Sequence, residues 1–407
     1  MSPFSIPEIM KYTTIFYLTA AILLAKGNPA HSQKGIPPKD VVKINTTTTY
    51  AQHVDFTPDL VKNLKVPAGW EVSIAASGLG KPRMLFFGKP GELYVTRRDA
   101  GDILLLTDKN GDHKYDEVKT AVTDFKGVHG ITIKEGWLYG CNNNEVRRYK
   151  LKPDGSADSD AREILINDLP SGGQHSNRTI DFGADGLLYI TVGSVCNDCV
   201  GDKETATILT ADPKTWKRAI YASGLRNTIG FDWHPQTGEL WGVDNGSDFK
   251  GDTWPPEELN RLVKNTDYGF PFAYGKREVD KTREDPVGTT KEDIAKASEP
   301  SVMEFPAHSA PIDFKFFGAG TPFSGDALVC WHGSWNATNV VGYKVERIAF
   351  KNGQPSGSQD FLSGFLINNN KERFGRPSGL AIANDGIVYI SDDANGIIYC
   401  VKPTSKK

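Results

Sequence analysis

A module of short strands recurs from about residue 66 to residue 402, and this recurrence restricts the possible folds more than any other feature. Each copy begins with Pro or Arg, continues as an apolar strand and a turn with Gly, and ends in a strand rich in Tyr, Val and Ile. Clear copies read KPRMLFFGKPGELYVTRRDAGDILLLTD, SNRTIDFGADGLLYITVGS and GRPSGLAIANDGIVYISDDANGIIYCVKP. A strand-built repeat of about 45 to 50 residues predicts a β-propeller. Counting one degenerate copy near residues 310–350 predicts about six blades.

Composition agrees with an all-β fold. The chain has 407 residues, of which 39% are hydrophobic, 41 are Gly and 24 are Pro, so it holds a large core and many tight turns. We therefore expect a six-bladed β-propeller over residues 63–405. The strand Trp70 to Ala76 is expected to pair into the last blade and close the ring. A short helix is expected in an insertion, within residues 280–299.

The first residues resemble a targeting segment. Lys11 precedes the apolar run TTIFYLTAAILLA, which is too short to span a bilayer comfortably, and small residues follow near position 32. We interpret residues 1–32 as a signal peptide and residues 33–62 as a linker, with an uncleaved anchor as the alternative. The mature protein is then exported, either periplasmic or secreted, and no other stretch is apolar enough for a stable membrane span.

Charge and cysteine content limit the partners and cofactors. The net charge of −3 carries no broad basic field, so nucleic acid is not an expected partner. Of five cysteines, Cys196 and Cys199 form the motif CNDC. Val200 stands where covalent haem attachment needs His, and zinc lacks a second ligand pair. Two readings stay open for this motif: a local disulfide, or two free thiols.

Ionisable residues precede the first strands of several repeats. The segments that lead into the innermost strands of a propeller surround its central channel. The residues at these places are His129, His175 with Arg178, Arg226 with Asn227, and Arg376. A turn can form without ionisable side chains. Their presence at equivalent places in several repeats therefore predicts a polar pocket at the mouth of the central channel. Each of them also has a plain reading, as a loop residue bonded to backbone or as an ion pair between blades.

An acidic segment, DKNGDHKYDE, presents a second candidate metal site. Its Asp108, Asn110, Asp112 and Asp116 follow the spacing of a calcium loop. However, His113 replaces the expected glycine, and Lys119 replaces the closing glutamate. Both an exposed turn and a calcium loop remain open, and the exposed turn is favoured.

Four motifs in the same order carry a family resemblance: GGQHSNR, GLRNTIGFDWHPQTGELWGVDNGSD, PPEELNRLVKNTDYGFPFAYG and HGSW. With them the chain resembles the soluble sugar dehydrogenases that use pyrroloquinoline quinone (PQQ), in the L-sorbosone or glucose dehydrogenase-like family. The resemblance covers residues 66–402. It implies a six-bladed propeller, PQQ in the axial pocket, Ca²⁺, and oxidation of a sugar hydroxyl.

The resemblance also assigns roles to residues of this chain. It implies that His175 is the catalytic base, which suits an imidazole near neutral pH, and that Arg226 stabilises charge on the reduced quinone. The residues implied to bind the cofactor are Arg226, Asn227, Arg376, Arg178, His129 and Trp335. The backbone carbonyls of Gly246 and Ser247 are implied to hold one Ca²⁺, and Glu258 with the carbonyl of Tyr268 a structural one. Without the resemblance, the first pair reads as a simple turn and Glu258 as a solvated charge.

Two departures limit what the resemblance transfers. The better-known glucose-oxidising branch has a glutamine near Val128 and a lysine near the GSWNATN loop, and neither occurs here. Its substrate preference is therefore not carried over.

Three functions fit these observations. The first is oxidation of an aldose, or of a sorbosone-like aldehyde or alcohol, by hydride transfer to PQQ, with an external electron acceptor such as a cytochrome or quinone. The second is a calcium-dependent hydrolase of the lactonase type, centred on Asp244, Asn245 and Asp392. The third is a propeller without catalytic activity that binds a glycan or protein.

Overall fold

The computed structural model describes residues 42–404. The chain divides into two units, residues 1–39 and 40–407, and only the second contains described residues. The predicted signal peptide, residues 1–32, lies outside the described residues, as does the first part of the predicted linker. Within the described residues, no helix combines the length and apolar character needed to cross a bilayer.

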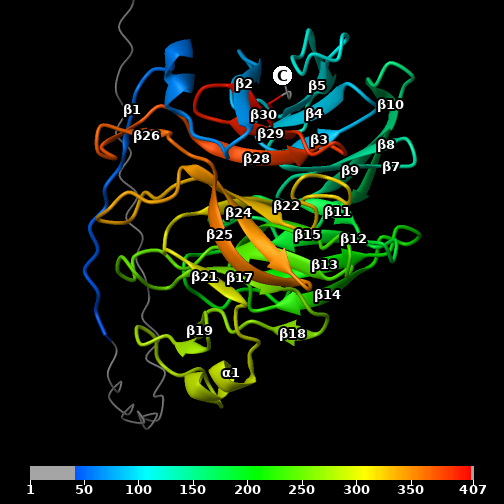
Figure 1. The fold of residues 1–407 in the computed structure, drawn as a ribbon. Coiled ribbons are helices and arrows are strands. Elements are labelled where there is room, and N and C mark those ends of the chain that lie inside the picture. The colour runs from blue at the N-terminus through cyan, green and yellow to red at the C-terminus, as the bar shows by residue number, and fades with distance from the viewer. Residues whose placement is uncertain (1–41, 405–407) are drawn as a thin grey trace, which may run out of the picture. The chain divides into compact units, whose positions relative to one another are not determined.

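Within residues 42–404, six β-sheets of four or five strands follow one another (Figure 1). The first sheet contains β3 (Leu85–Phe87), β4 (Glu92–Arg97), β5 (Asp102–Thr107) and β6 (Glu117–Val122). The second contains β7 (Gly130–Lys134), β8 (Trp137–Cys141), β9 (Val146–Leu151) and β10 (Ala157–Ile166). The third contains β11 (Ile180–Phe182), β12 (Leu188–Val192), β13 (Thr207–Ala211), β14 (Arg218–Ser223) and, parallel to β14, β18 (Thr266–Asp267).

The remaining three sheets repeat this order. The fourth contains β15 (Thr228–Trp233), β16 (Leu240–Asp244), β17 (Glu257–Arg261) and β21 (Met303–Phe305). The fifth contains β22 (Pro311–Phe316), β23 (Ala327–Trp331), β24 (Lys344–Lys351) and β25 (Gln354–Leu362). The sixth contains β28 (Pro377–Ile382), β29 (Val388–Asp392), β30 (Ile397–Pro403) and β2 (Trp70–Ala76). The all-β class predicted from the sequence is therefore confirmed.

Smaller elements decorate this framework. Strand β1 (Gln52–His53) pairs with β27 (Glu372–Arg373), which also pairs with β26 (Leu366–Ile367). A 3-10 helix, η1 (Pro58–Asn63), follows β1. The insertion after β17 contains the hairpin β19 (Ala273–Tyr274) and β20 (Glu278–Val279), and the predicted helix is confirmed there as α1 (Lys291–Ala297). The Thr290 side chain accepts a hydrogen bond from the Asp293 amide and caps this helix.

Neighbouring sheets pack face to face in a cycle. Strand β3 lies against β7, β7 against β11, β12 against β15, β15 against β22, β22 against β28, and β28 against β3. Each of six apolar clusters combines side chains of two neighbouring sheets. Central strands such as β29 and β23 are buried along their whole length, while the outer strands β10 and β25 expose many residues. This burial explains why a central strand such as β23 reads as an unbroken apolar run.

The sixth sheet joins the two ends of the described chain. Strand β2 pairs antiparallel with β30, with Trp70 opposite Pro403 and Ala76 opposite Ile398 (blue beside red in Figure 1). Aromatic packing supports this strand, because Trp70 stacks on Phe323 with ring centroids 5.3 Å apart. The predicted pairing of Trp70 to Ala76 into the last sheet is confirmed.

The cysteines fall into two groups. Cys196 and Cys199 form a disulfide, which decides between the two readings of the CNDC motif. Cys141, Cys330 and Cys400 are free and buried.

Removing β30 is expected to abolish cooperative folding. The strand is internal to its sheet, and its residues 397–401 are buried. Burying a large apolar side chain contributes about 1.5–3 kcal/mol, so the loss of this buried strand is comparable with the whole stability of a domain, about 5–15 kcal/mol. A chain ending at Gly396 should show no thermal unfolding transition by circular dichroism. A chain ending at Thr404 is the matched control and should unfold like the full chain; a normal transition in the shorter chain contradicts the expectation.

Candidate cofactor and substrate site

A cavity of about 770 Å³ opens at one end of the sheets. Its walls come from segments that lead into first strands, including Arg83 before β3 and Arg376 before β28. They also come from residues that directly follow second strands, including Arg98 after β4 and Asp393 after β29. In an antiparallel pair, the start of one strand and the end of the next lie at the same edge, which explains why both sets meet here.

The cavity wall is cationic. Its charged lining residues are Lys81, Arg83, Arg98, Arg373 and Arg376 against Asp99 and Asp393. Two buried donors on this wall, Nε of Arg83 and Nη1 of Arg373, have no hydrogen-bond partner in the described structure. Buried donors without partners are costly, so these atoms suit an anionic ligand that carries several acceptors. A second cavity, of about 630 Å³, lies at the opposite ends of β3 and β4 and has a mixed, largely aromatic and acidic wall.

His332, Asp393 and Arg83 form a compact group on the cavity wall. Nε2 of His332 lies 2.9 Å from a carboxylate oxygen of Asp393, which also accepts from Arg83 at 2.5 Å. Burial lowers the pKa of His332 to about 4, so the ring is neutral near pH 7 and donates its Nε2 proton to the carboxylate. Arg376 donates to the carbonyl of His332 at 3.1 Å, which ties the last sheet to the fifth.

His175 is held by Ser194, the second residue after β12. Nδ1 of His175 lies 2.8 Å from the Ser194 carbonyl and 2.9 Å from its hydroxyl oxygen. The hydroxyl donates its proton to the Cys196 carbonyl, so Nδ1 must be the donor to Ser194. The neutral ring then carries its lone pair on Nε2. Burial, and next the charge of Arg226, lower the pKa of His175 to about 3.

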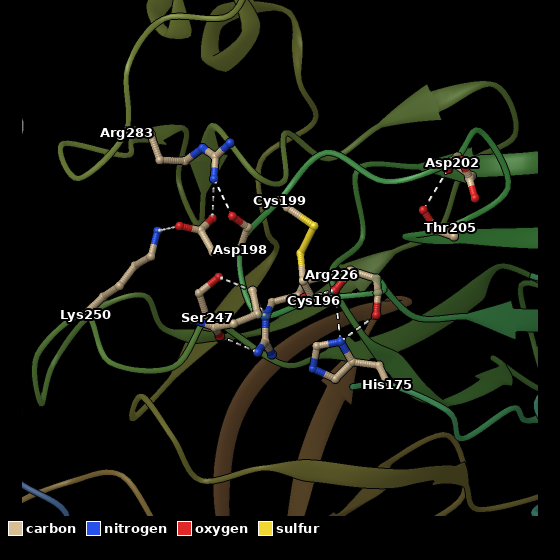
Figure 2. Close-up of a disulfide and its surroundings, with 12 residues drawn as sticks. His175, Cys196, Asp198, Cys199, Asp202, Thr205, Arg226, Ser247, Lys250 and Arg283 are labelled. Carbon is tan, nitrogen blue, oxygen red and sulfur yellow. Dashed lines mark hydrogen bonds and ion pairs between the residues drawn. A yellow bond between two sulfur atoms is a disulfide. The ribbon is translucent and has the colours of Figure 1, made fainter. Parts of the chain in front are cut away.

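Arg226 is almost fully buried, and its guanidinium is largely occupied (Figure 2). Nε donates to the Asn197 carbonyl, and Nη2 donates to the Asn197 side chain at 2.8 Å and to Asp248 at 2.9 Å. Nη1 donates to the Asn245 carbonyl at 3.3 Å. Four of the five N–H groups that an arginine carries are thus engaged, and one at Nη1 remains.

The buried carboxylate of Asp244 orders the segment around Arg226. It accepts from the amides of Arg226 and Asn227 and from the Thr228 hydroxyl, all within 2.9 Å. Burial raises its pKa to about 6. Asp392 accepts from the amides of Arg376, Ala394 and Asn395. Asp244 and Asp392, the two carboxylates that a hydrolase would use in the channel, therefore both accept hydrogen bonds from backbone amides.

The turn after β16 presents free carbonyl oxygens. Among the described residues, the carbonyls of Gly246 and Ser247 receive no hydrogen bond. Glu257 holds this turn, because one carboxylate oxygen accepts from the Gly246 amide at 2.8 Å and the other from the Ala310 amide at 2.9 Å. Burial raises the pKa of Glu257 to about 8. Backbone oxygen is a ligand that Ca²⁺ accepts, so the turn fits a cation.

At the second predicted calcium site, the Glu258 carboxylate is engaged, whereas the Tyr268 carbonyl accepts no hydrogen bond among the described residues. Glu258 is buried and accepts from the Asn260 side chain and the Gly275 amide, and burial raises its pKa to about 7. The Tyr268 hydroxyl, which is not the predicted ligand, donates to the Arg261 carbonyl and accepts from the Val263 amide. Across residues 42–404, no group of three or more acidic, His or Cys side chains is arranged to hold a metal. The acidic loop at residues 108–116 is therefore not arranged to hold a metal either. The Asp108 carboxylate instead accepts hydrogen bonds from the amides of Gly111 and His113 in the same turn.

The structure separates the predicted residues into two groups. His175, Arg226, Asn227, Gly246 and Ser247 form one connected cluster, and Arg376 and Trp335 line the cavity. His129 and Arg178 are also buried, and their polar contacts are with backbone carbonyls. Arg178 donates to the carbonyls of His175, Asn177 and Pro170, and His129 bonds to the Arg178 carbonyl, so both brace the loop that carries His175.

Several lining residues were not predicted. Arg83 precedes the first strand of its module, as Arg376 does. The equivalent position in the repeat therefore indicated Arg83 as a residue of the cavity wall. Arg98, His332 and Asp393 instead follow second strands, where the sequence analysis selected other residues, such as Gly246, Ser247 and Trp335. Reading both ends of each hairpin would have found them.

Comparison with known proteins places the chain in a family. The family model described as TrAA12-like matches residues 64–404. The chain belongs to this family. An uncharacterized protein of Borreliella burgdorferi is 29% identical over 84% of this chain and 92% of its own length. A Pyrroloquinoline quinone-dependent sugar dehydrogenase of Hypocrea jecorina is 25% identical over 83% of this chain and 89% of its own.

Solved structures share the fold of this TrAA12-like protein. A family AA12 carbohydrate-active enzyme of Trichoderma reesei has a TM-score of 0.74 and 23% identity, with 88% of this chain and 100% of that chain covered. The PQQ domain of pyranose dehydrogenase from Coprinopsis cinerea, in its holo form, has a TM-score of 0.71 and 20% identity, covering 86% and 98%.

The neutral state of His175 is expected to make stability depend on pH. Its folded pKa of about 3 lies below the value of about 6.5 for an unfolded chain. Between these values the unfolded chain binds a proton that the folded chain does not, so stability falls as the pH falls. His175→Asn, which keeps an N–H near Nδ1, should lose up to about 1.4 kcal/mol per pH unit of this dependence. Urea unfolding at pH 4, 5, 6 and 7 measures the free energy of unfolding of both proteins. If this free energy changes with pH equally in wild type and His175→Asn, the His175 ring of the folded protein is not held neutral.

Proposed function

We propose that residues 63–405 form a six-bladed β-propeller and that this protein is an exported, PQQ-dependent sugar dehydrogenase. The closed cycle of six sheets supports the blade number. The observation that carries the function is the cavity itself: its wall is cationic, and it includes Gln174 and Asn177, which lie on either side of His175 in the chain. His175 has a free Nε2 lone pair. Relatives and structural neighbours described as PQQ-dependent support the same cofactor.

The residues present fit PQQ, which carries several carboxylates. Arg83, Arg373 and Arg376 supply paired planar donors on one side of the cavity, as anion recognition requires. Trp335 lines the cavity and is packed edge-to-face against Phe249, so it offers an ordered aromatic wall. When bound, the quinone supplies the acceptor for a hydride from the substrate carbon.

His175 is proposed as the general base. Its Nδ1 proton is fixed by Ser194, so Nε2 is free to accept the proton of a substrate hydroxyl. The low pKa keeps Nε2 unprotonated near pH 7. Substrate binding that shields the ring from Arg226, or that pairs with the imidazolium, raises this pKa and strengthens the base.

The region around Arg226 is proposed to carry Ca²⁺ and to stabilise negative charge. The carbonyls of Gly246 and Ser247 are the proposed ligands of the cation, beside the one remaining N–H of Arg226. A structural calcium at Glu258 and Tyr268 stays a proposal, which needs release of the Glu258 contacts described above. Asn227 is buried and fixes the local backbone through Asp244.

The substrate class is a sugar, and an aldose oxidised at a ring carbon that bears a hydroxyl gives a lactone. The electrons then leave to an external acceptor, a cytochrome or a quinone. Titration of the apoprotein with PQQ, with and without Ca²⁺, followed by dye reduction with aldoses, polyols and aldehydes, tests this assignment. Binding without turnover overturns the substrate class, and lactone hydrolysis without quinone favours the hydrolase reading.

Replacing the proposed base should slow turnover without preventing cofactor binding. His175→Asn removes proton acceptance at Nε2, and general base catalysis contributes about 10²–10⁴-fold. The dye-coupled assay should show a loss of kcat of this size while PQQ affinity stays within about twofold. His113→Asn, in the second cavity, is the control, because Asn tolerates the positive φ of 70° at this position. Equal kcat in both variants removes His175 from catalysis.

Removing an unpaired arginine should weaken PQQ binding. Arg373→Gln deletes a buried donor that lacks a partner, and a charged hydrogen bond is worth about tenfold or more in affinity. Lys371→Gln changes the charge equally but on an exposed neighbour, so it should bind PQQ like the parent. Fluorescence titration at two salt concentrations measures both; equal affinities place the cofactor elsewhere.

A further inference from the structure

The disulfide loop, defined here as Cys196–Cys199, connects the His175 and Arg226 cluster to the insertion after β17 (Figure 2). The loop begins four residues after the end of β12, a buried central strand of the third sheet. Its disulfide joins residues whose Cα atoms are 5.9 Å apart and encloses only Asn197 and Asp198. A ring this small leaves few backbone conformations for the two enclosed residues.

Asn197 binds Arg226 through both its backbone and its side chain. The carbonyl accepts from Nε at 2.8 Å, and the side-chain oxygen accepts from Nη2 at 2.8 Å. One residue thus receives two of the four engaged N–H groups of the guanidinium. The plane of the guanidinium is fixed by these two contacts, which come from one edge.

Asn197 also binds the turn that carries Ser247. Its side-chain oxygen accepts from the Asp248 amide at 2.8 Å, and its side-chain nitrogen donates to the Asp248 carbonyl at 3.0 Å. Its own carbonyl accepts from the Ser247 hydroxyl at 3.2 Å. The amide therefore pairs with both backbone groups of Asp248, as a neighbouring strand would, and it sets the position of the preceding carbonyls.

The loop is anchored on both sides of Asn197. Before it, the Cys196 carbonyl accepts from Ser194, the same residue that orients His175. After it, the Asp198 carboxylate pairs with Lys250 at 2.6 Å and with Arg283 at 3.0 Å. Lys250 also pairs with the fully buried Asp280, so the loop is connected to the core of the insertion. Asn197 therefore cannot shift without loss of several buried polar contacts.

We propose that Asn197 is a positioning residue for the cofactor site, and that the Cys196–Cys199 disulfide keeps it in the conformation that holds both Arg226 and the turn at residues 246–248. This inference rests on the proposed function only for its effect on PQQ and Ca²⁺ binding. Its structural part concerns the protein without cofactor. Reduction by a dithiol transfers two electrons and two protons to the disulfide, gives two cysteine thiols and a cyclic disulfide of the reagent, and frees the loop.

Hydrogen exchange in the cofactor-free protein tests the structural part. Asn197→Ala removes the acceptor of the Asp248 amide, so exchange in a peptide that covers residues 246–248 should accelerate about tenfold or more, as expected for loss of a buried hydrogen bond. Wild-type protein treated with dithiothreitol should show the same change at a smaller size. Asn144→Ala is the matched control, since this side chain also donates to a distant carbonyl, that of Asn167. Unchanged exchange at residues 246–248 in both the variant and the reduced protein overturns the proposal.

PQQ titration tests the consequence for the site. The dissociation constant for PQQ with Ca²⁺ should rise about tenfold or more in Asn197→Ala and in reduced wild type, as expected when a charged group loses its hydrogen bonds. At saturating cofactor the KM for the sugar should stay within about twofold. Asn197→Asp keeps the oxygen that binds Arg226 and the Asp248 amide, so it should recover most of the affinity.

The outcomes separate the two proposals. If wild type does not bind PQQ, the proposed function fails while hydrogen exchange still tests Asn197. If wild type binds PQQ and all variants bind equally well, the positioning role is wrong although the function stands. If Asn197→Ala does not fold, the comparison of reduced with oxidised wild type and of Asn197→Asp with wild type decides the same question.

Discussion

Apolar packing between neighbouring sheets is the interaction on which this structure depends. Each sheet buries side chains against both neighbours, and the six clusters between them run in a cycle without an open face. The innermost strands add buried polar links between sheets. Asp232 of β15 accepts from an amide of β22, and Asp313 of β22 accepts from an amide of β28. Since the sheets are fixed in this way, short loops at one end are enough to hold a site.

That site combines two kinds of order. Buried carboxylates with raised pKa values, such as Asp244 and Glu257, accept backbone amides and so shape the loops from beneath. Arginines line the cavity, and two of them keep a buried donor without a partner in the described structure. Acidic groups at this site thus bond to the protein's own backbone, whereas arginines line the cavity where a ligand can bind. This division explains why a protein of net charge −3 presents a cationic cavity.

The repeat predicted the all-β class and the closing strand at Trp70–Ala76, and a local pattern in the insertion predicted the short helix. The repeat also placed His175 and Arg226 near each other, because equivalent positions of a repeat meet in space. It did not predict that His129 and Arg178 are buried under the loop, since burial depends on neighbouring sheets. Nor did it reveal Asn197, because a residue inside a four-residue motif carries no periodic signal. The blade number and the residue roles remain predictions.

The pairing of β2 with β30 also governs when the protein becomes complete. These strands lie at opposite ends of the described chain, and contacts of such large sequence separation form slowly. During synthesis the first and fifth sheets keep an uncovered apolar face until residues 397–403 have left the ribosome. A nascent chain therefore exposes apolar surface until these residues are made, and exposed apolar surface of this kind favours aggregation over folding.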